Sequence, residues 1–284
     1  MGVNAVLDQL ELGDHVCCPI SGPAQTWAVA AATTACGLRD GHKMLFFVDD
    51  PDGLRQFLAT TVPGAERAVV HHQVQIHPGA GTYLGDTGFD PDRVFDMWVA
   101  EIDLADHQGF AGVRATGDIR PATPRRRPNI DAVIEYEHRL NTIFTQRRVI
   151  GICHCDPGGF TPATWQRILA VHPTTVLPTG DGTLARLHSA CTATGIRLTG
   201  TVDLLNQDAL PGVLTEVAAL PGACRIDAKG LEFVNAHAIG CLLQTAAART
   251  GRPTTIVCRP HLAKVLKLCG SASIPGLVVT TESP

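Results

Sequence analysis

The chain has 284 residues, of which 45% are hydrophobic and 18% charged, so a mainly disordered state is excluded and a substantial core can form. Its net charge of −4 gives no electrostatic basis for nucleic-acid binding, because nucleic-acid-binding modules usually carry a basic face. No apolar run approaches the roughly 18 residues that span a bilayer, and the N-terminus lacks the basic and apolar regions of a signal peptide. A cytoplasmic protein without a membrane segment is therefore expected.

The first 173 residues alternate short apolar strands with helical segments. Residues 43–50 form an apolar run closed by Asp49 and Asp50, which is typical of a strand buried on both faces of a parallel sheet. Repeated β-α-β units of this kind predict an α/β fold with an open parallel sheet between helices. The strands are expected at 15–20, 43–50, 69–77, 112–118 and 149–156, and the helices at 23–41, 51–62, 90–109, 129–148 and 161–173.

A second, smaller α/β unit is expected after a Thr-, Pro- and Gly-rich stretch at 174–187. The predicted domains are therefore 1–175 and 186–284, joined by a linker at about 176–185. In the second domain, strands are expected at 193–203, 224–230 and 253–258, and helices at 206–220, 236–251 and 260–270.

The second domain contains GIRLTGTVDLLNQDAL at 195–210 and CRIDAKGLEFVNAHAIGCLLQTAAART at 224–250. These stretches resemble a STAS domain, the anti-anti-sigma fold. The resemblance implies a domain that binds a protein partner such as an anti-sigma factor. In switched members, a serine of an Asp-Ser-Ser-Gly motif is phosphorylated at a helix N-terminus, where a phosphate meets free N–H groups.

This sequence departs from the STAS motif at the switch position, where Asn235, Ala236, His237 and Ala238 stand. His237 occupies the position of the serine that is phosphorylated in switched members, so serine phosphorylation cannot occur there. One interpretation is a partner-binding domain without the kinase switch, with Asn235 and His237 at its binding surface. The other is that Asn235 only caps the helix and His237 is an ordinary surface residue.

The first domain contains GDHVCCPISGP at 13–23, GLRDGHKMLFFVDDP at 37–51, IEYEHRLN at 134–141 and VIGICHCDPGGFTPATWQRILAVHP at 149–173. These stretches resemble a MEDS domain, a sensory module of regulators from methanogens and methylotrophs. The resemblance implies a RecA-like sheet and the binding of a small molecule. Nucleotide hydrolysis is not expected, because the place of the phosphate loop has one glycine and no lysine.

Strand geometry places the candidate sensor residues. Alternate residues of a strand share a face, so His15 and Cys17 are expected on one face, as are Cys153 and Cys155. Ligands of open α/β sheets bind outside the carboxyl ends of the strands. The candidate ligand-binding residues near such ends are His15, Cys17, Asp49, Asp118 and Cys155.

Four interpretations of the early His-Val-Cys-Cys sequence remain open. The cysteines could line a ligand pocket, His15, Cys17 and Cys155 could bind a soft metal, Cys17 and His15 could form a nucleophile pair, or these residues could be ordinary core. No CxxC pair occurs, which disfavours a zinc ribbon. The preferred hypothesis is a sensor and not an enzyme, because no catalytic residue set is complete, and no cofactor is identified. A homodimer is one possible assembly. The alternative is a metal- or cofactor-binding enzyme or a redox sensor that uses His15, Cys17 and the strand with Cys153 and Cys155.

Overall fold

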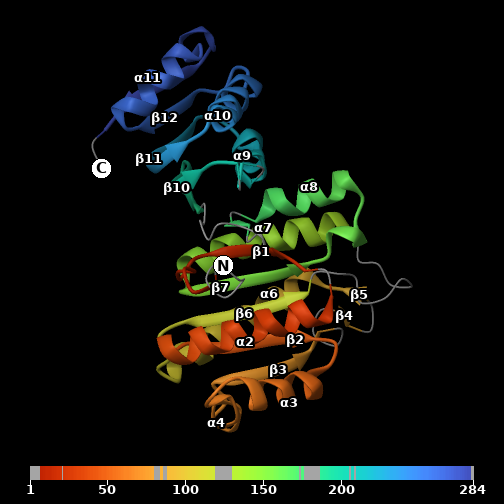
Figure 1. Ribbon diagram of the computed structural model, residues 1–284. Helices are drawn as coiled ribbons and strands as arrows, with labels where there is room; N and C mark the ends of the chain where they lie inside the picture. Colours follow the sequence, from red (N-terminus) through yellow and green to blue (C-terminus); the bar gives the residue numbers. More distant parts are fainter. Residues whose placement is uncertain are drawn as a thin grey trace. The chain divides into compact units, whose positions relative to one another are not determined.

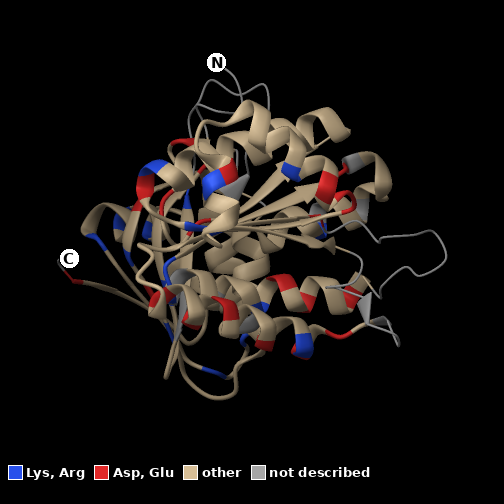
Figure 2. Cartoon of the chain, turned by 90° about the horizontal axis from the view of Figure 1, so that it is seen from below, with Lys and Arg blue, Asp and Glu red and all other residues tan. Residues whose placement is uncertain are grey.

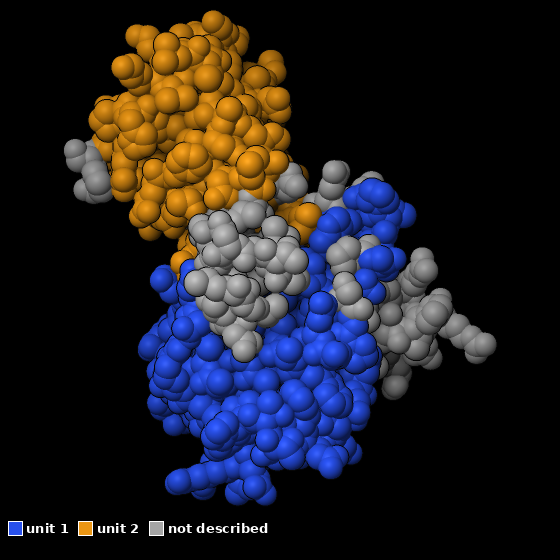
Figure 3. Space-filling view, in the orientation of Figure 1, with its two compact units in different colours: residues 1–165, 175–184 blue, residues 166–174, 185–284 orange. Residues whose placement is uncertain are grey.

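The computed structural model of the chain is drawn in Figure 1. Its contacts divide the chain into two compact units (Figure 3): Met1–Trp165 with Thr175–Leu184, and Gln166–Thr174 with Ala185–Pro284. The expected linker at about 176–185 lies outside the described residues. The structure describes residues 7–20, 22–79, 84–85, 88–118, 130–172, 174–175, 186–204, 206–207 and 209–282.

A parallel sheet forms the centre of the first unit. Its strand order is β3-β2-β6-β7-β1-β8, and the pairings from β3 across to β1 are all parallel. The predicted α/β class is therefore confirmed. The strands are β1 (His15–Pro19), β2 (Lys43–Val48), β3 (Val74–Pro78), β6 (Val113–Asp118), β7 (Val149–Cys155) and β8 (Thr174–Thr175), and β4 (Leu84–Gly85) and β5 (Gly88–Phe89) form a separate hairpin.

Helices cover both faces of this sheet (Figure 1). Along β2, Met44 and Phe46 pack against one group of helices, while Leu45 and Phe47 pack against another. The first group is α2 (Pro23–Asp40), α3 (Pro51–Thr61) and α4 (Ala65–Val70), and the second is α6 (Pro91–His107) and α7 (Ile130–Gln146). This alternation follows from the period of two along a strand, so β2 is buried on both sides as its sequence predicts.

Local signals explain most element boundaries. Asp50 caps α3, because its Oδ1 accepts a hydrogen bond of 2.9 Å from the backbone N–H of Gly53, and Pro51 opens the helix. Thr161 caps helix α8 (Pro162–Val171) in the same way, at 3.2 Å from the N–H of Thr164. The strand expected at 69–77 is only half correct, because its first residues belong to helix α4 and the strand begins at Val74.

The second unit is built on a five-stranded sheet of order β13-β12-β11-β10-β9, in which only β9 is antiparallel to its neighbour. Strand β13 was not expected from the sequence, and the strand expected at 193–203 is the second arm of the hairpin β9–β10. The elements are β9 (Leu187–Thr192), β10 (Gly195–Val202), α9 (Ala209–Ala219), β11 (Cys224–Val234), α10 (Ala236–Ala248), β12 (Thr254–Cys258), α11 (Pro260–Leu268) and β13 (Leu277–Thr281).

Charged residues lie mainly on helices and loops, as Figure 2 shows. Three cations among the described residues are buried. Arg249 donates to the backbone carbonyl oxygens of Leu220 and Gly222. Lys43 and Arg114 each have an acidic partner, Glu101 at 3.1 Å and Asp40 at 2.9 Å. Such pairing is required, because an unpaired charge inside a protein costs several kcal/mol. Among the described residues, no helix is both long and apolar enough to cross a membrane.

Candidate functional site

The candidate site is built on the paired strands β1 and β7. Their register places His15 opposite Gly151 and Cys17 opposite Cys153. Val16 and Cys18, on the other face, pack into an apolar cluster with residues of α2 and with Ile150 and Ile152. His15 and Cys17 therefore face α7, as the alternation of strand residues predicts.

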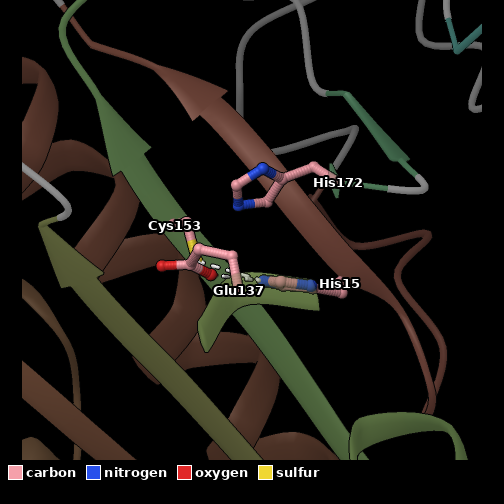
Figure 4. A group of neighbouring side chains, drawn as sticks. All are labelled: His15, Glu137, Cys153 and His172. Carbon is pink, nitrogen blue, oxygen red and sulfur yellow. Dashed lines mark hydrogen bonds and ion pairs between the residues drawn. The ribbon is translucent and has the colours of Figure 1, made fainter. Parts of the chain in front are cut away.

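Three polar side chains meet on the α7 face (Figure 4). His15 Nε2 lies 3.2 Å from the carboxylate oxygen Oε2 of Glu137 and 3.3 Å from the sulfur of Cys153. The Cys153 thiol in turn donates to Glu137 Oε2 over 3.6 Å. All three are buried, so water does not screen these contacts. The three residues, called here the His–Glu–Cys cluster, come from β1, α7 and β7.

Figure 4 also draws His172, the residue that follows α8. Its Nδ1 lies 2.7 Å from the carbonyl oxygen of Ile168. By its contacts His172 belongs to the second unit, so the His–Glu–Cys cluster is defined by residues of the first unit alone.

The orientation of the His15 ring is fixed by its neighbours. Nδ1 lies 2.8 Å from Asn141 Oδ1, which can only accept, so Nδ1 carries the proton. The ring also meets Phe144 edge to face, at 5.0 Å between centroids. Gly151 makes room for Phe144, because a Cβ at position 151 would collide with its ring. In neutral His15, Nε2 then presents a lone pair toward Glu137 and Cys153.

A second pair of sulfurs lies beside the cluster. The Cys17 thiol donates to Cys155 Sγ over 3.2 Å. Burial is the main cause that raises the pKa of the Cys155 thiol well above its usual range. Burial, with the Glu137 carboxylate, does the same for the pKa of Cys153. At neutral pH without a bound cation, both thiols are therefore protonated.

A small pocket of about 20 Å³ adjoins the cluster, which is room for about one water molecule. Glu137 and Cys153 supply its polar lining, while aromatic and aliphatic side chains close the rest. The apolar lining includes Trp98, Tyr136, Leu140, Phe144 and Ile152. The site thus combines a few convergent polar groups with apolar walls, the usual composition of a ligand pocket, on a very small scale.

Residues 14–173, more than half of the chain, match the protein-family model described as "MEDS: MEthanogen/methylotroph, DcmR Sensory domain". The chain belongs to the MEDS family. The sensory character expected for the first domain is thereby confirmed, and His15, Glu137 and Cys153 all lie inside the matched MEDS region.

No curated protein matches the chain. Among solved structures, it is similar to the crystal structure of the flagellar accessory protein FlaH from Methanocaldococcus jannaschii. The sequences are 10% identical, the TM-score is 0.40, and the superposition covers 70% of this chain and 82% of that chain. A likeness at this level carries no argument about the fold or function of the MEDS protein.

The structure brings some of the predicted sensor residues together and separates one. Cys17 and Cys155 are in contact with each other, and His15 contacts Cys153. Asp118 ends β6 opposite His154 of β7, and its charge contributes to the raised pKa of Cys153. Asp49 is exposed after β2, which is separated from β7 by β6, so it does not join the buried cluster.

The predicted switch position of the second unit lies at the start of α10. Asn235 caps this helix, since its Oδ1 accepts from the N–H of Ala238 at 2.9 Å. His237 is exposed, and its Nε2 lies 3.4 Å from the sulfur of Cys241, one turn along.

Sequence reasoning missed Glu137 as a site residue. Its neighbours on α7, Glu135 and His138, are exposed and half-buried, respectively. Glu137 occupies a position in the buried stripe of α7, between Val133 and Leu140. A carboxylate at helical spacing among apolar residues was the signal that could have identified it.

Proposed function

We propose that this MEDS protein is a cytoplasmic sensor. A sensory domain over residues 1–175 binds a small ligand at the His–Glu–Cys cluster, and a STAS-like domain over residues 186–284 passes the bound state to a protein partner. The observation that carries this proposal is the convergence of His15, Glu137 and Cys153 between the sheet and α7 of a MEDS domain. A carboxylate such as Glu137 is almost never fully buried unless it is paired, and groups with strongly perturbed pKa values cluster at functional sites.

The pocket limits the size of the ligand. A volume of about 20 Å³ accepts a water molecule or an ion without any movement. A larger organic ligand would have to displace side chains that close the pocket, such as Tyr136 or Phe144. Both belong to α7, so displacement would move the helix that also carries Glu137 and Asn141.

The partner-binding role of the second unit rests on its STAS-like sequence and on exposed apolar side chains near α10. Leu204 is 80% exposed and Phe233 is 54% exposed. Leu204 follows β10, and Phe233 lies two residues before the helix cap Asn235. An anti-sigma-type partner is the proposed occupant of this surface. Control by the sensor would replace the missing phosphorylation at His237.

A second candidate function, a redox sensor, rests on the 3.2 Å between the sulfurs of Cys17 and Cys155. The thiolate is the form that reacts with oxidants, and burial raises the pKa of Cys155 well above its usual range. Both thiols are also inaccessible to solvent. The ligand sensor is therefore preferred.

Native mass spectrometry of the full-length protein tests the proposed function. The wild-type chain is expected to carry a co-purifying ligand, and a His15→Gln variant is expected to lose it. Cys18→Ala, which removes a buried thiol from the opposite face of β1, is the matched control and should keep the ligand. Equal ligand occupancy in all three proteins would contradict a sensor site at the cluster.

Signalling to the second unit is tested by hydrogen exchange. Removal of the co-purified ligand from the full-length protein is expected to change exchange at the start of α10, and its return should reverse the change. An exchange pattern in residues 186–282 that ignores the ligand would contradict the proposed coupling, even if the ligand binds.

A further inference from the structure

Three atoms of metal-ligand type converge within the first unit, each from a different secondary-structure element. They are His15 Nε2 from β1, Glu137 Oε2 from α7 and Cys153 Sγ from β7, and all lie within 4.8 Å of one another. Imidazole, carboxylate and thiolate are the three side-chain groups that bind zinc in proteins. The three residues are far apart in the sequence, so their meeting is a property of the fold.

The separations fit one common ion. Zinc lies about 2.0–2.2 Å from nitrogen and oxygen ligands and about 2.3 Å from sulfur, so tetrahedral ligands are about 3.3–3.6 Å apart. In the cluster, nitrogen to oxygen is 3.2 Å, nitrogen to sulfur 3.3 Å and sulfur to oxygen 3.6 Å. These three distances describe one triangular face of such a tetrahedron.

The state of the His15 ring favours the same interpretation. Asn141 Oδ1 holds the proton on Nδ1, which leaves Nε2 as the nitrogen with the lone pair. A metal-ligating histidine almost always donates its other N–H to an oxygen in this way. The Nε2 lone pair and a Glu137 carboxylate oxygen repel each other at 3.2 Å unless a cation or a proton lies between them.

We propose that His15, Glu137 and Cys153 bind one divalent transition-metal ion of the zinc class. The inference deepens the proposed function, on which it rests, by naming the class of ligand at the sensor site. Three protein ligands leave the fourth position of a tetrahedral ion open, as in sites that exchange water for another ligand. The small pocket lined by Glu137 and Cys153 has room for that one additional ligand.

Binding is a proton exchange at sulfur. The Cys153 S–H bond breaks, the sulfur keeps the electron pair and forms a bond to the ion, and the proton leaves to the buffer. A proton shared by His15 and Glu137 would leave in the same step. No oxidant or reductant takes part. The proton release can be measured, because the heat of binding then depends on the ionisation enthalpy of the buffer.

Zinc binding to the full-length protein, stripped with a chelator, tests the proposal. A competition titration is expected to give one tight ion per chain. Cys153→Ala, His15→Gln and Glu137→Gln should each weaken that binding at least 100-fold. Cobalt(II), used as a probe in the same protein, should show a thiolate-to-metal charge-transfer band that disappears in Cys153→Ala.

Matched variants exclude other sites. Cys18→Ala removes an equally buried thiol from the opposite face of β1 and should retain full binding. Cys17→Ala tests the neighbouring sulfur pair, and His237→Ala tests the exposed His237–Cys241 pair on α10. Both should also retain the tight ion. Circular dichroism identifies any variant that fails to fold, and Glu137→Gln, which keeps the side-chain shape, remains decisive if another variant is lost.

Two results would overturn the proposal. One is a wild-type chain without stoichiometric zinc. The other is tight zinc binding that survives in the folded variants Glu137→Gln and Cys153→Ala. The short contact between His15 and Glu137 would then be explained by a shared proton and not by a metal site. Neither result contradicts the sensor proposal, which is tested separately by the co-purifying ligand. An organic molecule can bind at the cluster without a metal if side chains of the pocket move.

Discussion

The two faces of strands β1 and β7 differ sharply, although they alternate residue by residue. On one face, Val16 and Cys18 lie in an apolar cluster with Ile150 and Ile152. On the other face, His15 meets Glu137 and Cys153, and Cys17 meets Cys155. Both faces are buried to nearly the same extent, so exposure does not distinguish them.

The comparison shows how one strand can stabilise a fold and carry a site. The apolar face contributes the burial energy, because each buried aliphatic side chain is worth about 1.5–3 kcal/mol. The polar face needs partners for every buried group, and α7 supplies them through Glu137 and Asn141. Substitutions on the first face should therefore change mainly stability, and substitutions in the His–Glu–Cys cluster should change ligand binding.

The largest expected effect is on the apolar face. Ile150→Ala, in the same apolar cluster, should lower the free energy of unfolding of the first unit by about 2–5 kcal/mol, through lost burial and the cavity that remains. Chemical denaturation followed by tryptophan fluorescence measures this, because Trp27, Trp98 and Trp165 all belong to the first unit. Below the unfolding transition the variant should bind zinc like the wild type. Loss of zinc from the folded variant would show that the two faces are not independent.

Cys18 provides a pH-dependent test of the same face. Burial, with a smaller effect of Cys17, raises the pKa of the Cys18 thiol from 9.0 to about 12. The native form of Cys18 is the neutral thiol. Its contribution to the free energy of unfolding is therefore complete below pH 9 and is lost as the pH rises from about 9 to about 12. The total loss from this group is about 4 kcal/mol.

Urea unfolding at several pH values between 8 and 11 measures this effect. The wild-type free energy of unfolding should fall more steeply than that of Cys18→Ala, which has no thiol to ionise at this position. Equal slopes for the two proteins would mean that Cys18 ionises as easily in the folded chain as in the unfolded one.

Much of the fold was predictable from local sequence signals. Apolar runs, proline at helix starts and capping residues such as Asp50 gave the β-α-β order of the first unit and the buried face of β2. The exceptions have physical reasons. Helix α4 has six residues, too few for a periodic pattern, and β13 follows a short 3-10 turn at Ser271–Ser273 rather than a long connection.

The site was predictable only in part. Strand alternation correctly grouped His15 with Cys17 and Cys153 with Cys155, because side-chain direction along a strand follows from local geometry. The partners across the sheet depend on register and on the rotation of α7. Neither is encoded locally, so Glu137 was missed and Asp49 was placed with residues from which β6 separates it.

Asn141 should have a smaller effect on stability and a selective effect on binding. Asn141→Ala removes the acceptor of the His15 Nδ1–H and should lower the free energy of unfolding by about 1–3 kcal/mol. It should also weaken zinc binding by about 10–100-fold, the usual cost of losing an outer partner of a ligating histidine. Asn141→Asp keeps an acceptor oxygen and should restore most of the affinity. If Asn141→Ala loses stability while its zinc affinity stays unchanged, Asn141 does not position His15 for zinc binding.

The smallest effects are expected at the exposed end of β2, where two neighbouring aspartates differ in role. Asp50 caps α3, so Asp50→Ala should cost about 1 kcal/mol of unfolding free energy. Asp49 is exposed, and its replacement by alanine should change stability by less than about 0.5 kcal/mol. Neither substitution should alter zinc or co-purified ligand, because the cluster is buried on β1, β7 and α7. Reduced ligand occupancy in Asp49→Ala would instead extend the sensor site to the carboxyl end of β2, where parallel sheets bind their ligands.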